Sequence, residues 1–123
     1  ENSVFIVLAK IDHILYKSRA YNSIISLNPV LKTMSHHECN LGKWYEGEGK
    51  ERFSKTSSYA KIVSPHEMVH KNANANMSYL DSDAQIKTLS NAQTIMNNFE
   101  AMERASEELF VVMDSMLKEA VRA

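Results

Sequence analysis

The sequence has 123 residues, of which 44% are hydrophobic and 24% charged, as in an ordinary globular domain. Its formal net charge of −1 excludes the basic footprint of a nucleic-acid-binding protein. No apolar run is long enough to cross a bilayer, because residues 4–9 are followed by Lys10 and Asp12. A single cysteine cannot form an internal disulfide, which favours a reducing, cytoplasmic location. We expect one domain over residues 1–123, cut from a longer chain because Glu1 and Ala123 stand in helix-forming sequence.

The chain is predicted to be all-α, because it has only three glycines, two prolines and no alternating strand pattern. The first predicted helix ends at Asn28-Pro29, since proline disfavours helix in the residue before it. Its apolar residues recur at helical spacing: Val4, Leu8, Ile11, Leu15 and then Ile24 or Ile25.

A short second helix follows. Residues 35–38, Ser-His-His-Glu, form a capping-box pattern, in which the serine caps the helix and the glutamate reaches back. We expect this helix to run through Cys39 and Trp44 and to stop at Gly47 and Gly49. Leu41 and Trp44 would seat it against its neighbours.

Two more helices complete the prediction. Residues 64–67, Ser-Pro-His-Glu, are a second capping box, with proline at the first helical position, and this helix should reach about Tyr79. A long helix over about 83–122 carries the last apolar stripe, Leu89, Ala92, Met96, Phe99, Leu109, Met113, Met116 and Ala120. The expected fold is an antiparallel four-helix bundle with an additional short helix carrying the cysteine.

His66 and His70 stand four residues apart, so they share one helix face and can reach one metal ion. With Glu67 they form His-Glu-x-x-His, the pattern of zinc proteases. Such a protease needs a third ligand downstream, but no histidine follows His70, and Glu67 is already explained as a cap partner. The protease hypothesis is therefore weak.

Cys39 strengthens the metal hypothesis, because N–H groups and the helix dipole in a first turn favour a thiolate, and thiolate with imidazole suits zinc. His13 lies in the first helix; it is either a core histidine or a further ligand. Bundles place ligands from several helices in their interior. We therefore predict a tetrahedral zinc site made of His13, Cys39, His66 and His70. His36 and His37 are alternative ligands, although the cap region that carries them should be exposed.

Three motifs in this order resemble the chemoreceptor zinc-binding domain (CZB) family: His13-Ile-Leu-Tyr-Lys, then Cys39-Asn-Leu-Gly-Lys-Trp-Tyr with Gly47-Glu-Gly49, then His66-Glu-Met-Val-His70. The resemblance covers roughly residues 8–80. It places the three-histidine, one-cysteine zinc site of the family on the same four residues, one zinc per chain. Tyr16 stands where the family often has tryptophan, and His36 and His37 inherit no ligand role.

The resemblance implies a sensory module rather than an enzyme, built as a four-helix bundle that often forms a homodimer. The likeness is to the C-terminal domain of soluble bacterial chemoreceptors that respond to oxidants such as hypochlorous acid. Cys39 would then be a redox-reactive thiolate whose oxidation modulates chemotaxis signalling through an attached signalling domain. The alternative is a structural, zinc-stapled dimerisation domain. A di-iron bundle of the hemerythrin kind is disfavoured, because the required His and Glu spacings are missing.

Overall fold

The computed structural model describes residues 2–122, with only the backbone of Arg122, and is all-α within that range, as predicted. In chain order the elements are α1 (Asn2–Ser26), α2 (Asn40–Glu46), α3 (Glu48–Phe53), the 3₁₀ helix η1 (Tyr59–Ile62), α4 (Val63–Met77), α5 (Ala84–Ser90) and α6 (Ala92–Arg122). The expectation about the two chain ends, Glu1 and Ala123, lies outside the described residues. None of the described helices is long and apolar enough to span a membrane.

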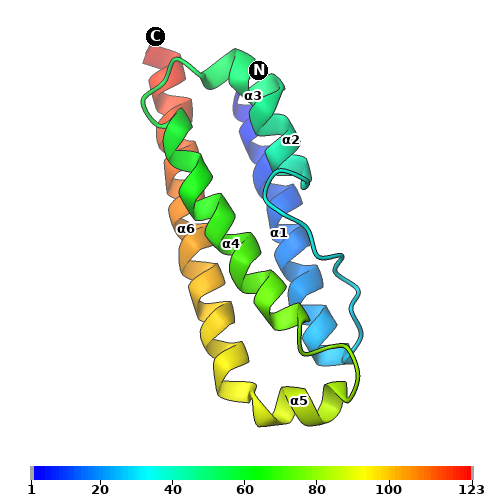
Figure 1. The fold of residues 1–123 in the computed structure, drawn as a ribbon. Coiled ribbons are helices and arrows are strands. Elements are labelled where there is room, and N and C mark those ends of the chain that lie inside the picture. Colours follow the sequence, from blue (N-terminus) through cyan, green and yellow to red (C-terminus); the bar gives the residue numbers. More distant parts are fainter. Residues whose placement is uncertain (1, 123) are drawn as a thin grey trace.

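Three long helices, α1, α4 and α6, run beside one another (Figure 1), and the most extensive contact is between α4 and α6. The short helices α2 and α3 lie along the half of α1 that is nearer the N-terminus, and α5 crosses the opposite end (Figure 1). An extended segment, residues 28–39, returns along α1 from that end to α2. The predicted four-helix count stays a prediction, since only three described helices are long.

The first helix forms as predicted and ends at Ser26, shortly before Asn28-Pro29. Its buried face consists of Ile6, Ala9, His13, Tyr16, Ala20 and Ser23. The apolar stripe singled out in the sequence lies on the other side, where Val4, Leu8, Ile11 and Leu15 are each 49–57% exposed. This helix therefore has an apolar face that the described chain leaves uncovered.

Three helix boundaries differ from the predictions. The short helix begins at Asn40, because the contact between Ser35 N–H and Glu38 Oε1, at 3.0 Å, closes a turn before the helix rather than its first turn. Helix α4 begins at Val63, directly after η1, so the second predicted cap lies inside the helix and makes no capping hydrogen bond. Gly49 lies within α3 rather than at a helix end.

The predicted helix over 83–122 is interrupted at Asn91, which separates α5 from α6. Both the backbone N–H and the side-chain amide of Asn91 donate to the carbonyl of Lys87, at 3.0 and 2.7 Å. The backbone bond is the ordinary helical one, and Asn72 makes the same side-chain bond within α4. The chain leaves the helix at Asn91 itself, whose φ of −117° and ψ of 21° are not helical. Beyond the break, the predicted stripe is partly correct, since Leu109, Met113 and Met116 are buried but Met96 is 56% exposed.

Two apolar clusters fill the interior. One contains Ile6, Ala9, Cys39, Leu41, Phe53, Ile62, Leu109, Met113 and Met116. The other contains Tyr16, Ala20, Leu31, Val69, Ala73, Met77, Leu80, Met102 and Ala105. His13 falls between Ala9 of the first cluster and Tyr16 of the second along α1, so a polar side chain occupies the junction of the two.

Candidate metal site

Three elements of the fold bring the predicted ligands together. His13 projects from the middle of α1, His66 and His70 occupy successive turns of α4, and Cys39 immediately precedes α2. All four side chains are buried, the histidines with 1–2% exposure and the cysteine with 6%. The ring nitrogens that the three histidines offer lie within 4.8 Å of one another.

The distances are those of atoms that face a common centre. The Cys39 sulfur lies 3.1 Å from Nε2 of His66, and this nitrogen lies 3.2 Å from Nε2 of His70. The His13 ring centroid is 5.1 and 5.6 Å from those of the two α4 histidines. Atoms bound to one tetrahedral zinc lie about 3.3–3.6 Å apart, given bonds of about 2.0–2.3 Å. The Cys39–His66 and His66–His70 separations are close to these values, whereas the histidine group as a whole is looser, within 4.8 Å, and does not include the sulfur.

His13 provides an independent test of this fit. Both of its ring nitrogens are buried and neither has a hydrogen-bond partner among the residues described. A buried polar atom without a partner costs about 1–3 kcal/mol, and a core histidine normally has at least one partner. A metal ion bound by one nitrogen would satisfy that atom. The lack of any partner therefore favours a ligand over a core histidine.

The environment keeps the three imidazoles neutral, as a metal requires of its histidine ligands. Burial, together with the neighbouring His70 and Lys17, lowers the pKa of His13 to about 3. Burial and the nearby histidines lower the pKa of His66 to about 2. For His70, burial and His36 lower the pKa to about 4. Each ring therefore keeps a free lone pair at neutral pH.

Cys39 caps α2 and accepts a hydrogen bond from the N–H of Gly42, with 3.4 Å between nitrogen and sulfur. Burial raises the pKa of this thiol, although N–H groups of Gly42 and Leu41 act in the opposite direction. The N–H groups thus favour a thiolate as expected, but desolvation outweighs them. A bound cation would be needed to hold the sulfur deprotonated at neutral pH.

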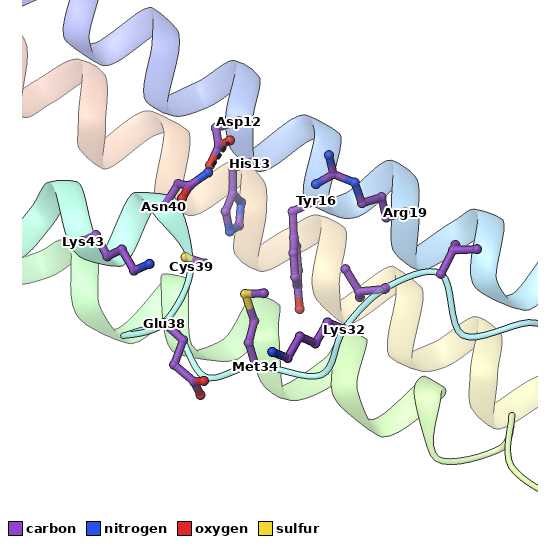
Figure 2. Close-up of a pocket in the computed structure, with 12 residues that line it drawn as sticks. Asp12, His13, Tyr16, Arg19, Lys32, Met34, Glu38, Cys39, Asn40 and Lys43 are labelled. Carbon is purple, nitrogen blue, oxygen red and sulfur yellow. Dashed lines mark hydrogen bonds between the residues drawn. The ribbon is translucent and has the colours of Figure 1, made fainter.

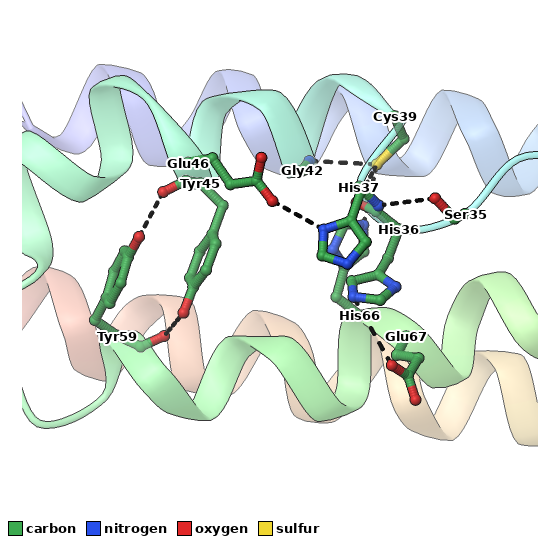
Figure 3. Close-up of polar contacts among 10 residues, drawn as sticks. All are labelled: Ser35, His36, His37, Cys39, Gly42, Tyr45, Glu46, Tyr59, His66 and Glu67. Carbon is green, nitrogen blue, oxygen red and sulfur yellow. Dashed lines mark hydrogen bonds and ion pairs between the residues drawn. The ribbon is translucent and has the colours of Figure 1, made fainter.

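Gly42 allows the close approach on which this cap depends (Figure 3). A Cβ atom built at this position would lie 1.9 Å from the carbonyl oxygen of His36. The obstacle is the backbone of the turn just before Cys39. Leu41, 1% exposed, is buried in the same cluster as Cys39, and Trp44 packs against that cluster.

The two alternative histidines each face a carboxylate (Figure 3). His37 Nδ1 contacts Glu46 Oε1 at 2.8 Å, and both side chains are exposed. His36 Nε2 lies 3.8 Å from a carboxylate oxygen of Glu67, so Glu67 pairs with His36 and does not cap α4. The ring centroid of His36 is 5.6 Å from that of His66, which places it beside the buried site.

Sequence reasoning gave no role to Tyr16, which lies against the site. Its ring centroid is 4.3 Å from that of His70, and it stacks on His13 at 5.6 Å. The side chain is 5% exposed and its hydroxyl has no partner in the described part of the chain. The only sequence signal was that tyrosine replaces the tryptophan common in the resembled family.

Comparison with known proteins agrees with the geometry. The sequence model of the chemoreceptor zinc-binding domain matches residues 13–77. This range starts at His13, contains Cys39, His66 and His70, and stops at the last residue of α4. No curated protein and no solved structure matches the chain.

Proposed function

The chain belongs to the chemoreceptor zinc-binding domain family, and from this premise we propose that it is a zinc-binding, redox-sensing domain of a cytoplasmic bacterial chemoreceptor. Within residues 1–123 it forms one sensory domain, and an attached signalling domain of the same protein receives its response. The role is regulatory and not enzymatic, as the family membership implies. The observation that carries the metal part is His13, which is buried beside two other neutral histidines and whose two ring nitrogens have no partner among the described residues.

One Zn²⁺ per chain is held by His13, Cys39, His66 and His70. The ion supplies a positive charge that keeps the cysteine sulfur deprotonated, against the effect of burial. The three histidines form a group without the cysteine, since their nitrogens lie within 4.8 Å of one another. They can therefore retain the ion when the sulfur leaves.

Cys39 is the redox-active residue, because a thiolate is the form of cysteine that oxidants attack. With hypochlorous acid, which the family membership suggests, the sulfur gains an oxygen atom and chloride leaves. The product is a sulfenic acid, and the two electrons lost by sulfur reduce the chlorine. Because Cys39 also caps α2, a displaced sulfur would loosen that helix from α1. This displacement is the signal passed to the attached domain.

The second candidate is a structural zinc site that stabilises the fold and shields Cys39 from oxidants. The burial of this residue, at 6% exposure, favours it. Mass spectrometry of the zinc-loaded protein after one equivalent of hypochlorous acid separates the two candidates. A sensor shows Cys39 oxidised before the methionines. Oxidation of exposed methionines such as Met68 and Met96, with Cys39 intact, would leave only the structural role.

A homodimer is part of the proposal. The exposed face of α1 carries six large apolar side chains, each 49–57% exposed: Val4, Val7, Leu8, Ile11, Ile14 and Leu15. A contiguous apolar surface of this kind marks an interaction site. His13 lies on the opposite, buried face of the same helix, so the helix that lines the metal site also lines the proposed interface.

A further inference from the structure

A pocket of about 560 Å³ opens beside the candidate metal site (Figure 2). Cys39 and His13 form part of its wall, and α1, residues 30–34 and the start of α2 supply the remainder. One water molecule has a share of about 30 Å³ in the liquid. The space therefore accepts an organic molecule of several carbon atoms next to the cysteine sulfur.

Three cationic and two acidic side chains line this pocket, a net charge of +1 that favours an anion. Arg19, Lys32 and Lys43 come from three different segments, and none of them forms an ion pair among the described residues. The two acidic side chains already have local donors. Asp12 accepts a hydrogen bond from the Asn40 amide at 3.1 Å, and Glu38 accepts from the N–H of Ser35 at 3.0 Å.

Tyr16 adds a buried polar group to the same wall. Its side chain is 95% buried, and its hydroxyl has no hydrogen-bond partner within the described residues. Figure 2 shows the hydroxyl directed toward Lys32 and Met34. Lys32 is exposed, and exposed side chains change rotamer within nanoseconds. The hydroxyl oxygen is itself fully buried here, so a carboxylate reaches it only after Lys32 turns aside. The phenol then donates the hydrogen bond at neutral pH.

The chemistry of Cys39 identifies the kind of anion. It is the only cysteine in the chain, so its sulfenic acid cannot be resolved by an internal disulfide. A thiol from outside must reduce it, and the pocket is the opening that reaches the sulfur. We propose that this pocket binds a small thiol bearing carboxylates, with Tyr16, Lys32 and Lys43 as its recognition groups, and that this thiol regenerates Cys39. The reductive step rests on the proposed redox function, whereas the anion site does not.

The reaction proceeds in two balanced steps. The bound thiolate attacks the Cys39 sulfur, an S–S bond forms, the S–O bond breaks, and the leaving hydroxide takes a solvent proton to become water. A second thiolate then attacks the outer sulfur of this mixed disulfide. It forms the external disulfide and releases Cys39 as a thiolate. The two thiols are oxidised, and the cysteine is reduced by two electrons.

Two thiols test the reductive step on the zinc-loaded full chain, after one equivalent of hypochlorous acid has oxidised Cys39. Mercaptosuccinate carries two carboxylates and 2-mercaptoethanol none. Replacing both lysines, K32Q/K43Q, should slow reduction by mercaptosuccinate about tenfold and leave the 2-mercaptoethanol rate unchanged. The control K50Q/K55Q removes the same charge from exposed positions outside the pocket and should behave as wild type. Equal slowing with both thiols would overturn the proposal. So would unchanged rates with both thiols.

Succinate tests the pocket without any redox chemistry, since it is mercaptosuccinate without sulfur. Chemical-shift titration of the reduced, zinc-loaded protein should show saturable binding of succinate at Tyr16 and none of neutral succinamide. Tyr16→Phe should weaken succinate binding about tenfold, because a hydrogen bond to a charged group is lost. If succinate does not bind while the sulfenic acid still forms, the proposed anion site is refuted and the redox function is not. If Cys39 never forms a sulfenic acid, the reductive step fails together with the redox function. Succinate binding would then still support the anion site, and its absence would refute that site as well.

Discussion

The Cys39 sulfur lies 3.1 Å from Nε2 of His66, although 27 positions separate the two residues in the chain. The extended segment 28–39 makes this contact possible by returning along α1 (Figure 1). Two anchors hold that segment. The N–H of Leu31 donates to Ser23 Oγ at 3.0 Å, and the amide of Asn74 donates to the carbonyl of Met34 at 2.9 Å. The position of Cys39 is thus fixed by both α1 and α4, the helices that carry the histidines.

The first prediction tests the ligand set by single substitutions. His13→Ala should weaken zinc binding by more than about 100-fold, because losing only an outer-shell partner of a ligand costs about 10–100-fold. His36→Ala should keep one zinc per chain, since His36 pairs with Glu67 outside the buried group. Zinc quantification after gel filtration and competition with a chelator measure both. Full zinc in His13→Ala, with loss in His36→Ala, would show that the ligands are assigned wrongly.

The second prediction concerns the turn before α2. Gly42→Ala places a Cβ 1.9 Å from the His36 carbonyl oxygen, and the obstacle is backbone that cannot rotate away. The free energy of unfolding should fall by about 3 kcal/mol, the upper end for overpacking, and zinc affinity should fall as Cys39 is displaced. Thermal denaturation and zinc competition measure these effects. Lys50→Ala, at an exposed position of α3, is the control, and an unchanged melting temperature for Gly42→Ala would refute the close approach.

Much of the architecture follows from the sequence because local rules determine it. The long helices and the spacing of His66 and His70 depend on helical periodicity and on few breakers. The approach of Cys39 to His66 depends on the path of residues 28–39, which no local pattern specifies. It was expected only because helical bundles place ligands in their interior and because of the family resemblance. The raised pKa of Cys39 was missed because burial, unlike a helix terminus, cannot be seen in the sequence. The interruption at Asn91 was missed because no glycine or proline near it marks a helix end.

The third prediction concerns acid stability and the contact between α1 and α6. Glu103 accepts hydrogen bonds from Lys17 Nζ at 2.7 Å and from the Tyr21 hydroxyl at 2.6 Å. Burial alone would raise the pKa of this carboxyl, but the two donors outweigh it and the pKa lies below its ordinary value of 4.5. A lowered folded-state pKa gives stability that is present above the unfolded value and is lost as the pH falls through the folded value.

Glu103→Gln should therefore be less stable than wild type at pH 7, by about 1 kcal/mol or less because the pair is partly exposed. This difference should shrink as the pH falls from about 5 to 3. Urea denaturation of the metal-free proteins at several pH values measures it. Glu100→Gln removes the same charge from an exposed position one turn earlier on α6 and should show little difference. A constant difference across the pH range would show that the carboxylate charge contributes nothing.

The last prediction tests the exposed face of α1 as a dimer interface. In a symmetric dimer each substituted residue meets its own copy or a close neighbour, so I11K/I14K brings four added charges into the apolar contact. Like charges across an interface cost several kcal/mol, and the dissociation constant should rise by more than about 100-fold. The control I86K/L89K places the same residues on α5, where Ile86 and Leu89 are 67% and 73% exposed, and should remain dimeric. Light scattering over a concentration series measures all three proteins, and a wild-type monomer at every concentration would exclude the dimer.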